Sequence, residues 1–173
     1  MYKVGTYVSY RSEGVCIINE IKQQEFGALD MLSEYYILSP IGDPNSKLYV
    51  PVNNEALVLK MRPLFSAEEL NALARELRNE KMEWIKEPRP RNNAFREILS
   101  LGDRVALIKL VHTLVAQAEV FESIGKTLTQ GDEMTLKRAK DMLIAEFSFT
   151  TNVNNEQRLM DLLYCRAECS PKA

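Results

Sequence analysis

The sequence has few of the features that mark secreted, membrane-spanning or metal-binding proteins. Its 173 residues include three cysteines, one histidine and one tryptophan. An odd set of cysteines, with no apolar leader at residues 1–5, does not suit a disulfide framework, so we expect reduced thiols. No stretch approaches the roughly 18 uninterrupted apolar residues of a membrane span. These absences predict a cytoplasmic protein that does not associate with membranes.

A strong excess of charge of one sign is also lacking. Lys and Arg total 22, Asp and Glu total 24, and the formal net charge is -2. Such a chain does not bind nucleic acid by bulk attraction, so any DNA contact must be local. Two groups of basic residues are candidates for local contact, and the alternative for both is a solvated helix face. The first group is Lys86, Arg89, Arg91, Arg96, Arg104 and Lys109, and the second is Lys137, Arg138 and Lys140.

Catalytic signatures are missing as well. The sequence has no P-loop, no G-x-G-x-x-G after a predicted strand and no G-x-S-x-G. His112 lies inside a predicted helix beside its apolar stripe, whereas Cys165 and Cys169 fall in a frayed C-terminal tail. These residues make neither a Cys/His nucleophile pair nor a four-ligand zinc site. We therefore expect no enzymatic activity, no metal and no cofactor, and we expect His112 to be either packed or partly exposed.

The first third of the chain has the patterns of a small sheet. With 46% hydrophobic and 27% charged residues, the composition suits one or two globular domains with a buried core. Apolar alternation over residues 4–10, a turn at 11–14 and an apolar run over 15–21 predict a hairpin. Pro51 cannot donate a ladder hydrogen bond, so it belongs at an edge, a bulge or a strand end. Residues 1 to about 62 thus predict four or five strands in a strongly bent sheet or barrel.

After Pro63 the apolar period changes from two to 3.6, which predicts helices. Helix caps are expected at Ser66 with Glu69 as a capping box, at Gly102 as a stop, at Asp103 as a start, and at Gly131–Asp132 as a second such pair. The resulting prediction is an all-helical bundle of about five helices over residues 63–173.

About six short patterns follow one another along nearly the whole chain. They are Tyr2-Lys3-Val4-Gly5 with Val8-x-Tyr10, Gly14-Val15 with Ile18-x-x-Ile21, Tyr35-Tyr36-Ile37-Leu38, Tyr49-Val50-Pro51-Val52 with Arg62-Pro63, Arg91-x-x-x-Phe95-x-x-x-Leu99-x-x-Gly102-Asp103, and Lys137-x-Ala139-x-x-x-Leu143-x-x-Glu146. In this order and spacing the chain resembles the CarD/CdnL family of bacterial transcription regulators. Its first part also resembles the polymerase-interacting module of transcription-repair coupling factors.

The resemblance implies an α+β protein of two domains. Residues 1–62 would form a Tudor-like or SH3-like small β-barrel that docks on the β subunit of RNA polymerase. Residues 63–173 would form the helical domain, which contacts promoter DNA at the upstream edge of the melted bubble and stabilises the open complex without reading sequence. The sequence does not specify the oligomeric state, and we expect a monomer. The residues implied are Trp84, Lys86, Arg89 and Arg91 for DNA, and Gln24, Phe26, Tyr49 and Pro51 for polymerase.

Two departures from the family pattern leave alternatives open. Trp84 lies about one helical turn further from Gly102 than the family's minor-groove tryptophan, whose position is occupied here by Pro88. Trp84 is therefore either a wedge between bases or an anchor that packs the linker on the bundle. Gln24 and Tyr49 stand where the family has polymerase-contacting arginines. The alternative function is a protein-protein adaptor with a Tudor-like domain and no DNA contact.

Overall fold

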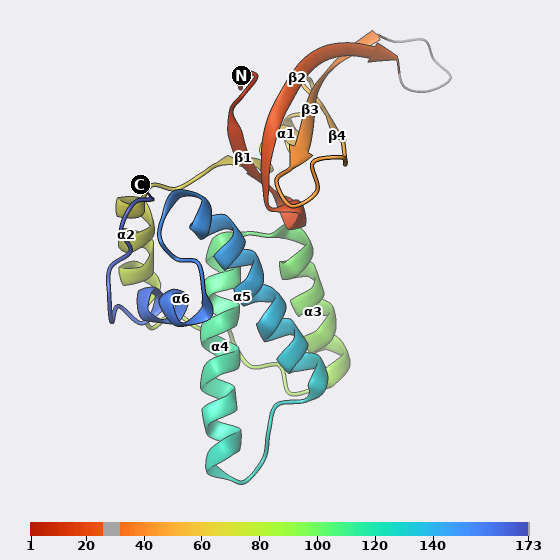
Figure 1. The fold of residues 1–173 in the computed structure, drawn as a ribbon. Coiled ribbons are helices and arrows are strands. Elements are labelled where there is room, and N and C mark those ends of the chain that lie inside the picture. Colours follow the sequence, from red (N-terminus) through yellow and green to blue (C-terminus); the bar gives the residue numbers. More distant parts are fainter. Residues whose placement is uncertain (26–31, 173) are drawn as a thin grey trace. The chain divides into compact units, whose positions relative to one another are not determined.

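The structure, a computed structural model, describes residues 1–25 and 32–172. The chain divides into two compact units, the sheet unit Met1–Leu64 and the helical unit Phe65–Ala173. Strands make up most of the first unit and helices make up most of the second (Figure 1). The predicted α+β class, with an antiparallel sheet ahead of a group of helices, is confirmed.

The sheet unit is built on a five-stranded sheet in the order β4-β3-β2-β1-β5, in which every paired strand is antiparallel (Figure 1). The strands are β1 (Tyr7–Tyr10), β2 (Val15–Glu25), β3 (Leu32–Pro40), β4 (Leu48–Pro51) and β5 (Met61–Pro63), and the single-turn helix α1 (Glu55–Val58) precedes β5. A short 3-10 turn and Gly14, whose φ of 74° suits glycine, join β1 to β2 as the hairpin pattern predicts. Pro51 ends the edge strand β4, in agreement with its predicted position.

One face of this sheet carries the core of the unit. Residues that pair directly across strands point to the same side, so their alternation collects apolar side chains on one face. The buried members are Val8, Tyr10, Cys16, Ile18, Tyr36, Leu38, Val50 and Met61. Burial, with a smaller contribution from Glu13, raises the pKa of the Cys16 thiol to about 12. That thiol is therefore protonated at physiological pH, which makes it a poor nucleophile.

A bulge in β2 keeps a carboxylate away from this core. The pairing of β2 with β3 shifts between Ile18 and Glu20, which adds one residue to β2 and reverses its alternation. As a result Ile21, and not Glu20, lies opposite the buried ring of Tyr36. The Asn19 side chain in the bulge donates a 2.7 Å hydrogen bond to Ser39 Oγ on β3.

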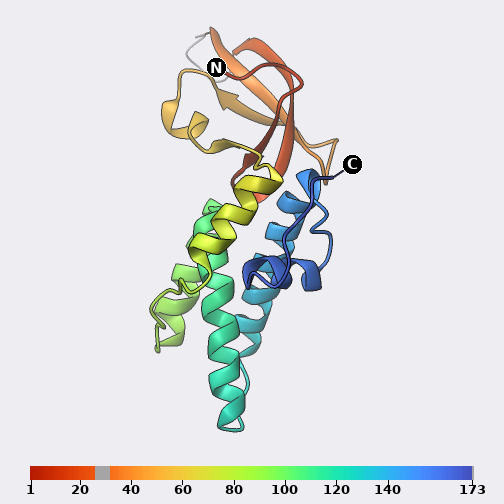
Figure 2. The ribbon, with the colours of Figure 1, turned by 90° about the vertical axis from the view of Figure 1, so that its left-hand side faces the viewer.

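Five helices follow in the described part of the helical unit. They are α2 (Ala67–Leu77), α3 (Pro88–Leu101), α4 (Arg104–Ser123), α5 (Gln130–Thr150) and α6 (Glu156–Leu163). The long helices α4 and α5 lie side by side in both views (Figures 1 and 2). Their facing side chains, with those of the other helices, bury a core that includes Leu70, Phe95, Leu110, Leu143 and Leu159. Over residues 1–25 and 32–172, none of the helices is both long enough and apolar enough to cross a membrane.

Three of the predicted helix boundaries are confirmed. Ser66 and Glu69 form a capping box at the start of α2, in which each side chain accepts a hydrogen bond from the other residue's backbone N–H. Gly102 ends α3 in the left-handed conformation with a φ of 63°. Asp103 then caps α4 by accepting a 2.9 Å hydrogen bond from the backbone of Ala106. These signals are local, which is why the sequence specifies them.

The boundary predicted at Gly131–Asp132 is wrong. Helix α5 starts at Gln130, and its cap is Thr129, whose hydroxyl accepts a 3.2 Å hydrogen bond from the backbone N–H of Asp132. Threonine is one of the preferred N-cap residues, because its hydroxyl can accept a hydrogen bond from the backbone N–H three residues later. The Asp132 side chain is thereby left to point inward, and it is fully buried.

The C-terminal segment is also not the frayed tail that was expected. Cys169 is 7% exposed, and its backbone makes two hydrogen bonds to the Asn71 side chain on α2, at 2.9 and 3.1 Å. Its thiol contacts the carbonyl of Ala67 at 3.6 Å. Asn152, after α5, also pairs with the backbone of Ser170. These partners are far away in sequence, and they hold the segment against the helical unit.

Candidate functional site

The segment between α2 and α3 carries the chain's single tryptophan. Trp84 is half-buried against the core of the helical unit. Its ring centroid lies 6.4 Å from that of Phe95 on α3 and 6.1 Å from that of Phe121 on α4, the second pair being edge-to-face. The Arg91 guanidinium carbon lies 4.5 Å from the same centroid. These are packing contacts of the kind expected for an anchor, and they leave part of the Trp84 surface accessible to a ligand.

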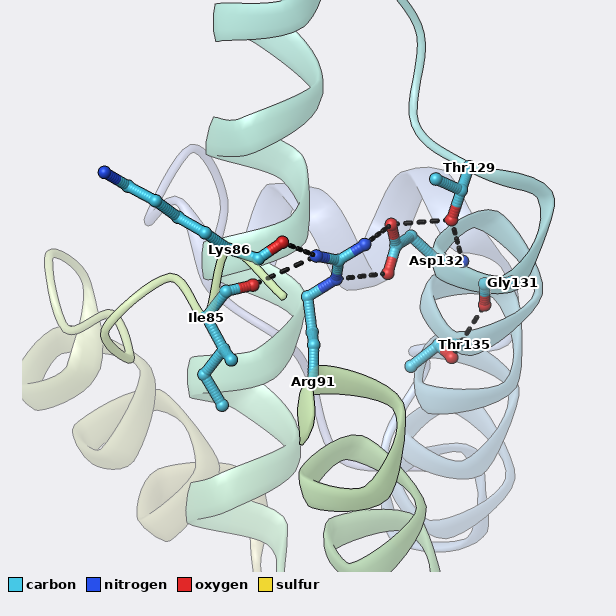
Figure 3. Close-up of polar contacts among 7 residues, drawn as sticks. All are labelled: Ile85, Lys86, Arg91, Thr129, Gly131, Asp132 and Thr135. Atoms are coloured by element: carbon cyan, nitrogen blue, oxygen red, sulfur yellow. Dashed lines mark hydrogen bonds and ion pairs between the residues drawn. The ribbon is translucent and has the colours of Figure 1, made fainter. Parts of the chain in front are cut away.

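Arg91 does not belong to an exposed DNA-binding surface, and its prediction as a phosphate contact is wrong. The residue is 4% exposed. Its Nε and Nη2 donate hydrogen bonds to the two carboxylate oxygens of Asp132 at 3.0 and 2.9 Å. Nη1 donates to the carbonyls of Ile85 and Lys86 at 3.0 and 2.9 Å (Figure 3). A guanidinium surrounded in this way has no side left for a phosphate.

Other members of the two basic groups are also engaged within the protein. Arg104 is 4% exposed, and its Nη2 lies 2.7 Å from Glu146 Oε1. Lys109 Nζ lies 3.2 Å from Glu80 Oε2, and Lys140 Nζ lies 2.6 Å from Glu156 Oε1. The exposed basic side chains that remain are Lys86, Arg89 and Arg96 in the first group and Lys137 and Arg138 in the second.

Lys86 and Arg89 are thus the two predicted DNA contacts that the structure leaves on the surface beside Trp84. Lys86 immediately precedes the N-terminal cap of α3, and Arg89 lies in the first turn of that helix. Both side chains are exposed. The Lys86 side chain points away from the Arg91 guanidinium, although its own carbonyl is held by it (Figure 3).

The predicted polymerase contacts fall on two strands. Tyr49 and Pro51 lie together on β4, an edge strand of the sheet, and the Tyr49 side chain is 38% exposed. Gln24 lies on β2, where its backbone pairs with Ser33, and β3 separates it from β4. Phe26 lies outside the described residues. The structure therefore brings Tyr49 and Pro51 to one edge and places Gln24 elsewhere.

Sequence reasoning missed Asp132 and Thr129, which complete the surroundings of Arg91. Asp132 is fully buried, and Thr129 Oγ1 donates a 2.7 Å hydrogen bond to Asp132 Oδ2. The spacing Thr-x-x-Asp at a helix start would have indicated a cap. It could not have indicated the ion pair, because Arg91 and Asp132 are 41 residues apart.

His112 is buried in the core of the helical unit, as a packing residue would be. It is 1% exposed, its Nδ1 lies 3.1 Å from the carbonyl oxygen of Glu80, and its ring centroid lies 5.1 Å from that of Tyr164. Burial lowers the pKa of the imidazole below its usual value of 6.5, and the charge of Lys81 acts in the same direction, whereas the Glu80 carbonyl opposes it. Among the described residues, no three His, Cys, Asp or Glu side chains are grouped to hold a metal ion.

The burial of His112 predicts a stability that falls with acid. Between the folded pKa and the unfolded value of about 6.5, only the unfolded chain binds the proton, so lowering the pH favours unfolding. The histidine contribution is fully present above pH 6.5 and is lost as pH falls through the folded pKa, with a slope of up to about 1.4 kcal/mol per pH unit. Urea unfolding at several pH values should show this slope, and His112→Asn should remove it. Because the chain has one histidine, an unchanged slope in His112→Asn would contradict the assignment.

Comparison with known proteins bears on the sheet unit. The family model described as the CarD-like/TRCF RID domain matches residues 2–64, which is the sheet unit almost from end to end. None of the curated proteins compared with the chain matches it. The matched residues include the sheet core, the bulge in β2 and the edge strand β4. The N-terminal sheet unit therefore matches the CarD-like/TRCF RID domain family.

Proposed function

We propose that this protein is a bacterial transcription regulator that docks on the β subunit of RNA polymerase and stabilises the promoter open complex. The observation that carries the proposal is the match of residues 2–64 to the RID family. The helical unit would contact the upstream edge of the melted bubble through Trp84, Lys86 and Arg89. It would do so without reading sequence and without catalysing a reaction.

The charge of the chain supports a DNA contact that depends on polymerase. A net charge of -2 and a surface on which Arg91, Arg104 and Lys109 are engaged internally give little free affinity for DNA. Docking on polymerase removes the need for such affinity, because it holds the helical unit near the promoter at a high local concentration. Two exposed cations can then position the phosphate backbone. An aromatic wedge compensates for the unstacking of a base step, which costs a few kcal/mol.

The edge strand β4 is the proposed docking surface on the sheet unit. An edge strand can accept a strand from another protein by extending the sheet, and nearby side chains then give specificity. Tyr49 and Pro51 lie on β4, and the exposed Tyr49 ring offers an apolar surface with a polar end. Since Tyr49 stands where the family has an arginine, this docking would depend on shape and apolar contact more than on charge.

Open-complex lifetime on a ribosomal RNA promoter tests the DNA contact. We expect Trp84→Ala to shorten the lifetime, and we expect Lys86→Glu with Arg89→Glu to shorten it and to reduce the salt slope of complex formation by about 2, or about 1 per phosphate contact. The matched control is Lys137→Glu with Arg138→Glu, which reverses two exposed cations on α5. Equal lifetimes for the folded variants and the unmodified protein would refute the DNA contact.

The adaptor function is the second candidate, and the packing of Trp84 against Phe95 and Phe121 is the observation that favours it. An adaptor would use the helical unit as a protein-binding surface and would not contact DNA. Retention of purified RNA polymerase by the immobilised full chain separates the possibilities. Polymerase docking predicts retention that Tyr49→Glu weakens, whereas an adaptor for another protein predicts no retention at all.

A further inference from the structure

A single buried side chain, Arg91, contacts three consecutive residues of the segment that carries the proposed DNA contacts. Its guanidinium lies over the ring of Trp84, at 4.5 Å, and donates to the carbonyls of Ile85 and Lys86. Arg91 lies in the first turn of α3, so these contacts fold the segment back onto the helix that follows it. The conformation of residues 84–86 therefore depends on where this guanidinium is held.

Helix α5 holds the guanidinium in place. Both oxygens of Asp132 accept from it, at 3.0 and 2.9 Å, in a two-pronged arrangement that fixes the plane of the group. Asp132 is itself fixed, because Oδ2 accepts a 2.7 Å hydrogen bond from the Thr129 hydroxyl, which also caps the helix (Figure 3). The chain of contacts thus runs from the start of α5 through Asp132 and Arg91 to the segment 84–86.

The number and geometry of these contacts suit arginine and no other residue. Arginine has five N–H donors in a rigid plane, whereas lysine has three donors on a point charge. Arg91 donates four hydrogen bonds of ordinary length, two from Nε and Nη2 to Asp132 and two from Nη1 to the backbone carbonyls. A lysine could keep the charge pair with Asp132, but it could not also hold both carbonyls and cover the ring of Trp84.

We infer that Arg91 is a positioning residue, which orients Trp84 and Lys86 for promoter DNA without touching DNA itself. The inference rests on the proposed function for its link to DNA. The exposed side chain of Lys86 extends away from the guanidinium that holds its backbone, as an oriented phosphate contact would (Figure 3). Residues 84–86 lie outside the helices and strands, so they have no regular ladder of hydrogen bonds to set their conformation.

Arg104 provides a matched control within the same unit. It is as buried as Arg91, at 4% exposed, and it also pairs with a carboxylate of α5, that of Glu146. It also lies over an aromatic ring, with its guanidinium carbon 3.9 Å from the centroid of Phe65. Because Glu146 is fourteen residues beyond Asp132 on the same helix, the two sites are separated by about 21 Å at 1.5 Å per residue.

The test compares Arg91→Lys with Arg104→Lys in the full-length protein. Trp84 is the only tryptophan, so its fluorescence reports directly on the segment. In folded protein we expect Arg91→Lys to shift Trp84 emission to longer wavelength and to increase its quenching by acrylamide, and we expect Arg104→Lys to do neither. Arg91→Lys should also shorten the open-complex lifetime at least as far as Trp84→Ala does, and adding Trp84→Ala to Arg91→Lys should shorten it no further.

Each other outcome has a definite meaning. Unchanged Trp84 emission in folded Arg91→Lys overturns the positioning role, because the conformation of the segment then does not depend on Arg91. An equal emission shift in Arg104→Lys also overturns it, because any loss of a buried arginine would then loosen the helical unit. Asp132→Asn, which keeps the shape and one acceptor, replaces Arg91→Lys if that variant does not fold, with the same expected shift. If Trp84→Ala leaves the open complex unchanged, the proposed function fails, while the fluorescence comparison still decides whether Arg91 positions the segment.

Discussion

Replacing Glu146 with alanine is expected to lower the free energy of unfolding of the helical unit by about 3–5 kcal/mol. Glu146 on α5 and Arg104 on α4 are both buried, and Arg104 Nη2 lies 2.7 Å from Glu146 Oε1. Removing the carboxylate leaves a guanidinium that cannot be deprotonated in a site of low dielectric constant. The large expected loss comes from that isolated charge more than from the value of the pair itself.

Two further variants separate this explanation from a simple loss of contacts. Arg104→Met combined with Glu146→Leu removes both charges and keeps much of the volume, so it should cost far less than Glu146→Ala alone. Glu156→Ala breaks the ion pair between Glu156 and Lys140. Because the Glu156 side chain is 65% exposed, this change should lower the free energy of unfolding by less than about 1 kcal/mol. Urea unfolding followed by Trp84 fluorescence measures all three. A double variant as unstable as Glu146→Ala would show that buried charge is not the cause.

The sequence predicted correctly those features that depend on interactions between residues close together in the chain. Ser66, Gly102 and Asp103 act on backbone groups within four residues of themselves, so their roles at helix ends are visible in the sequence. Hairpin strands and apolar alternation are similarly local, and both led to the antiparallel sheet. The Thr129 cap was missed because two acceptable caps lie close together, and which one acts depends on whether Asp132 is needed in the interior.

The misjudged charges show the opposite case. Counting charges around Arg91 and Arg104 suggested a basic surface, because their acidic partners lie on α5, more than forty positions later in the chain (132 − 91 = 41 and 146 − 104 = 42). The residues next to an arginine in the sequence do not indicate whether its guanidinium will be buried. Cys169 was misplaced for the same reason, since Asn71, which binds its backbone, is 98 residues away.

Trp84 is intermediate between these cases. Residues 82–87 lie outside regular structure, and Pro88 and Pro90, which are typical of a helix start, lie in the first turn of α3. Its ring contacts with Phe95 and Phe121 come from two different helices and could not be read from spacing. The irregular backbone of this segment can thus be recognised from nearby residues, whereas its orientation depends on tertiary contacts with Arg91.

The other large effect is expected in the sheet unit, where Tyr36→Ala should cost about 3–5 kcal/mol, as for other large aromatic truncations in cores. Tyr36 is 1% exposed, and it pairs with Val50 on β4 and Ile21 on β2. Its ring meets that of Tyr2 edge-on at 6.2 Å, and its hydroxyl accepts a 3.2 Å hydrogen bond from the Tyr2 backbone. Truncation therefore opens a cavity and removes two of the contacts that hold Tyr2.

A loss of this size is comparable to the whole stability of so small a unit. At about 0.05–0.15 kcal/mol per residue, a unit spanning Met1–Leu64 has about 3–10 kcal/mol. Tyr35→Ala is the matched control, since Tyr35 is adjacent, half-exposed and on the opposite face, and it should cost about 1 kcal/mol or less. Amide hydrogen exchange should show lost protection in β1–β4 for Tyr36→Ala, with polymerase retention lost as well. Because Trp84 reports only on the helical unit, the midpoint of the unfolding curve measured by Trp84 fluorescence should not change in Tyr36→Ala. A sheet whose amides remain protected in Tyr36→Ala would contradict the central role given to the Tyr36 ring.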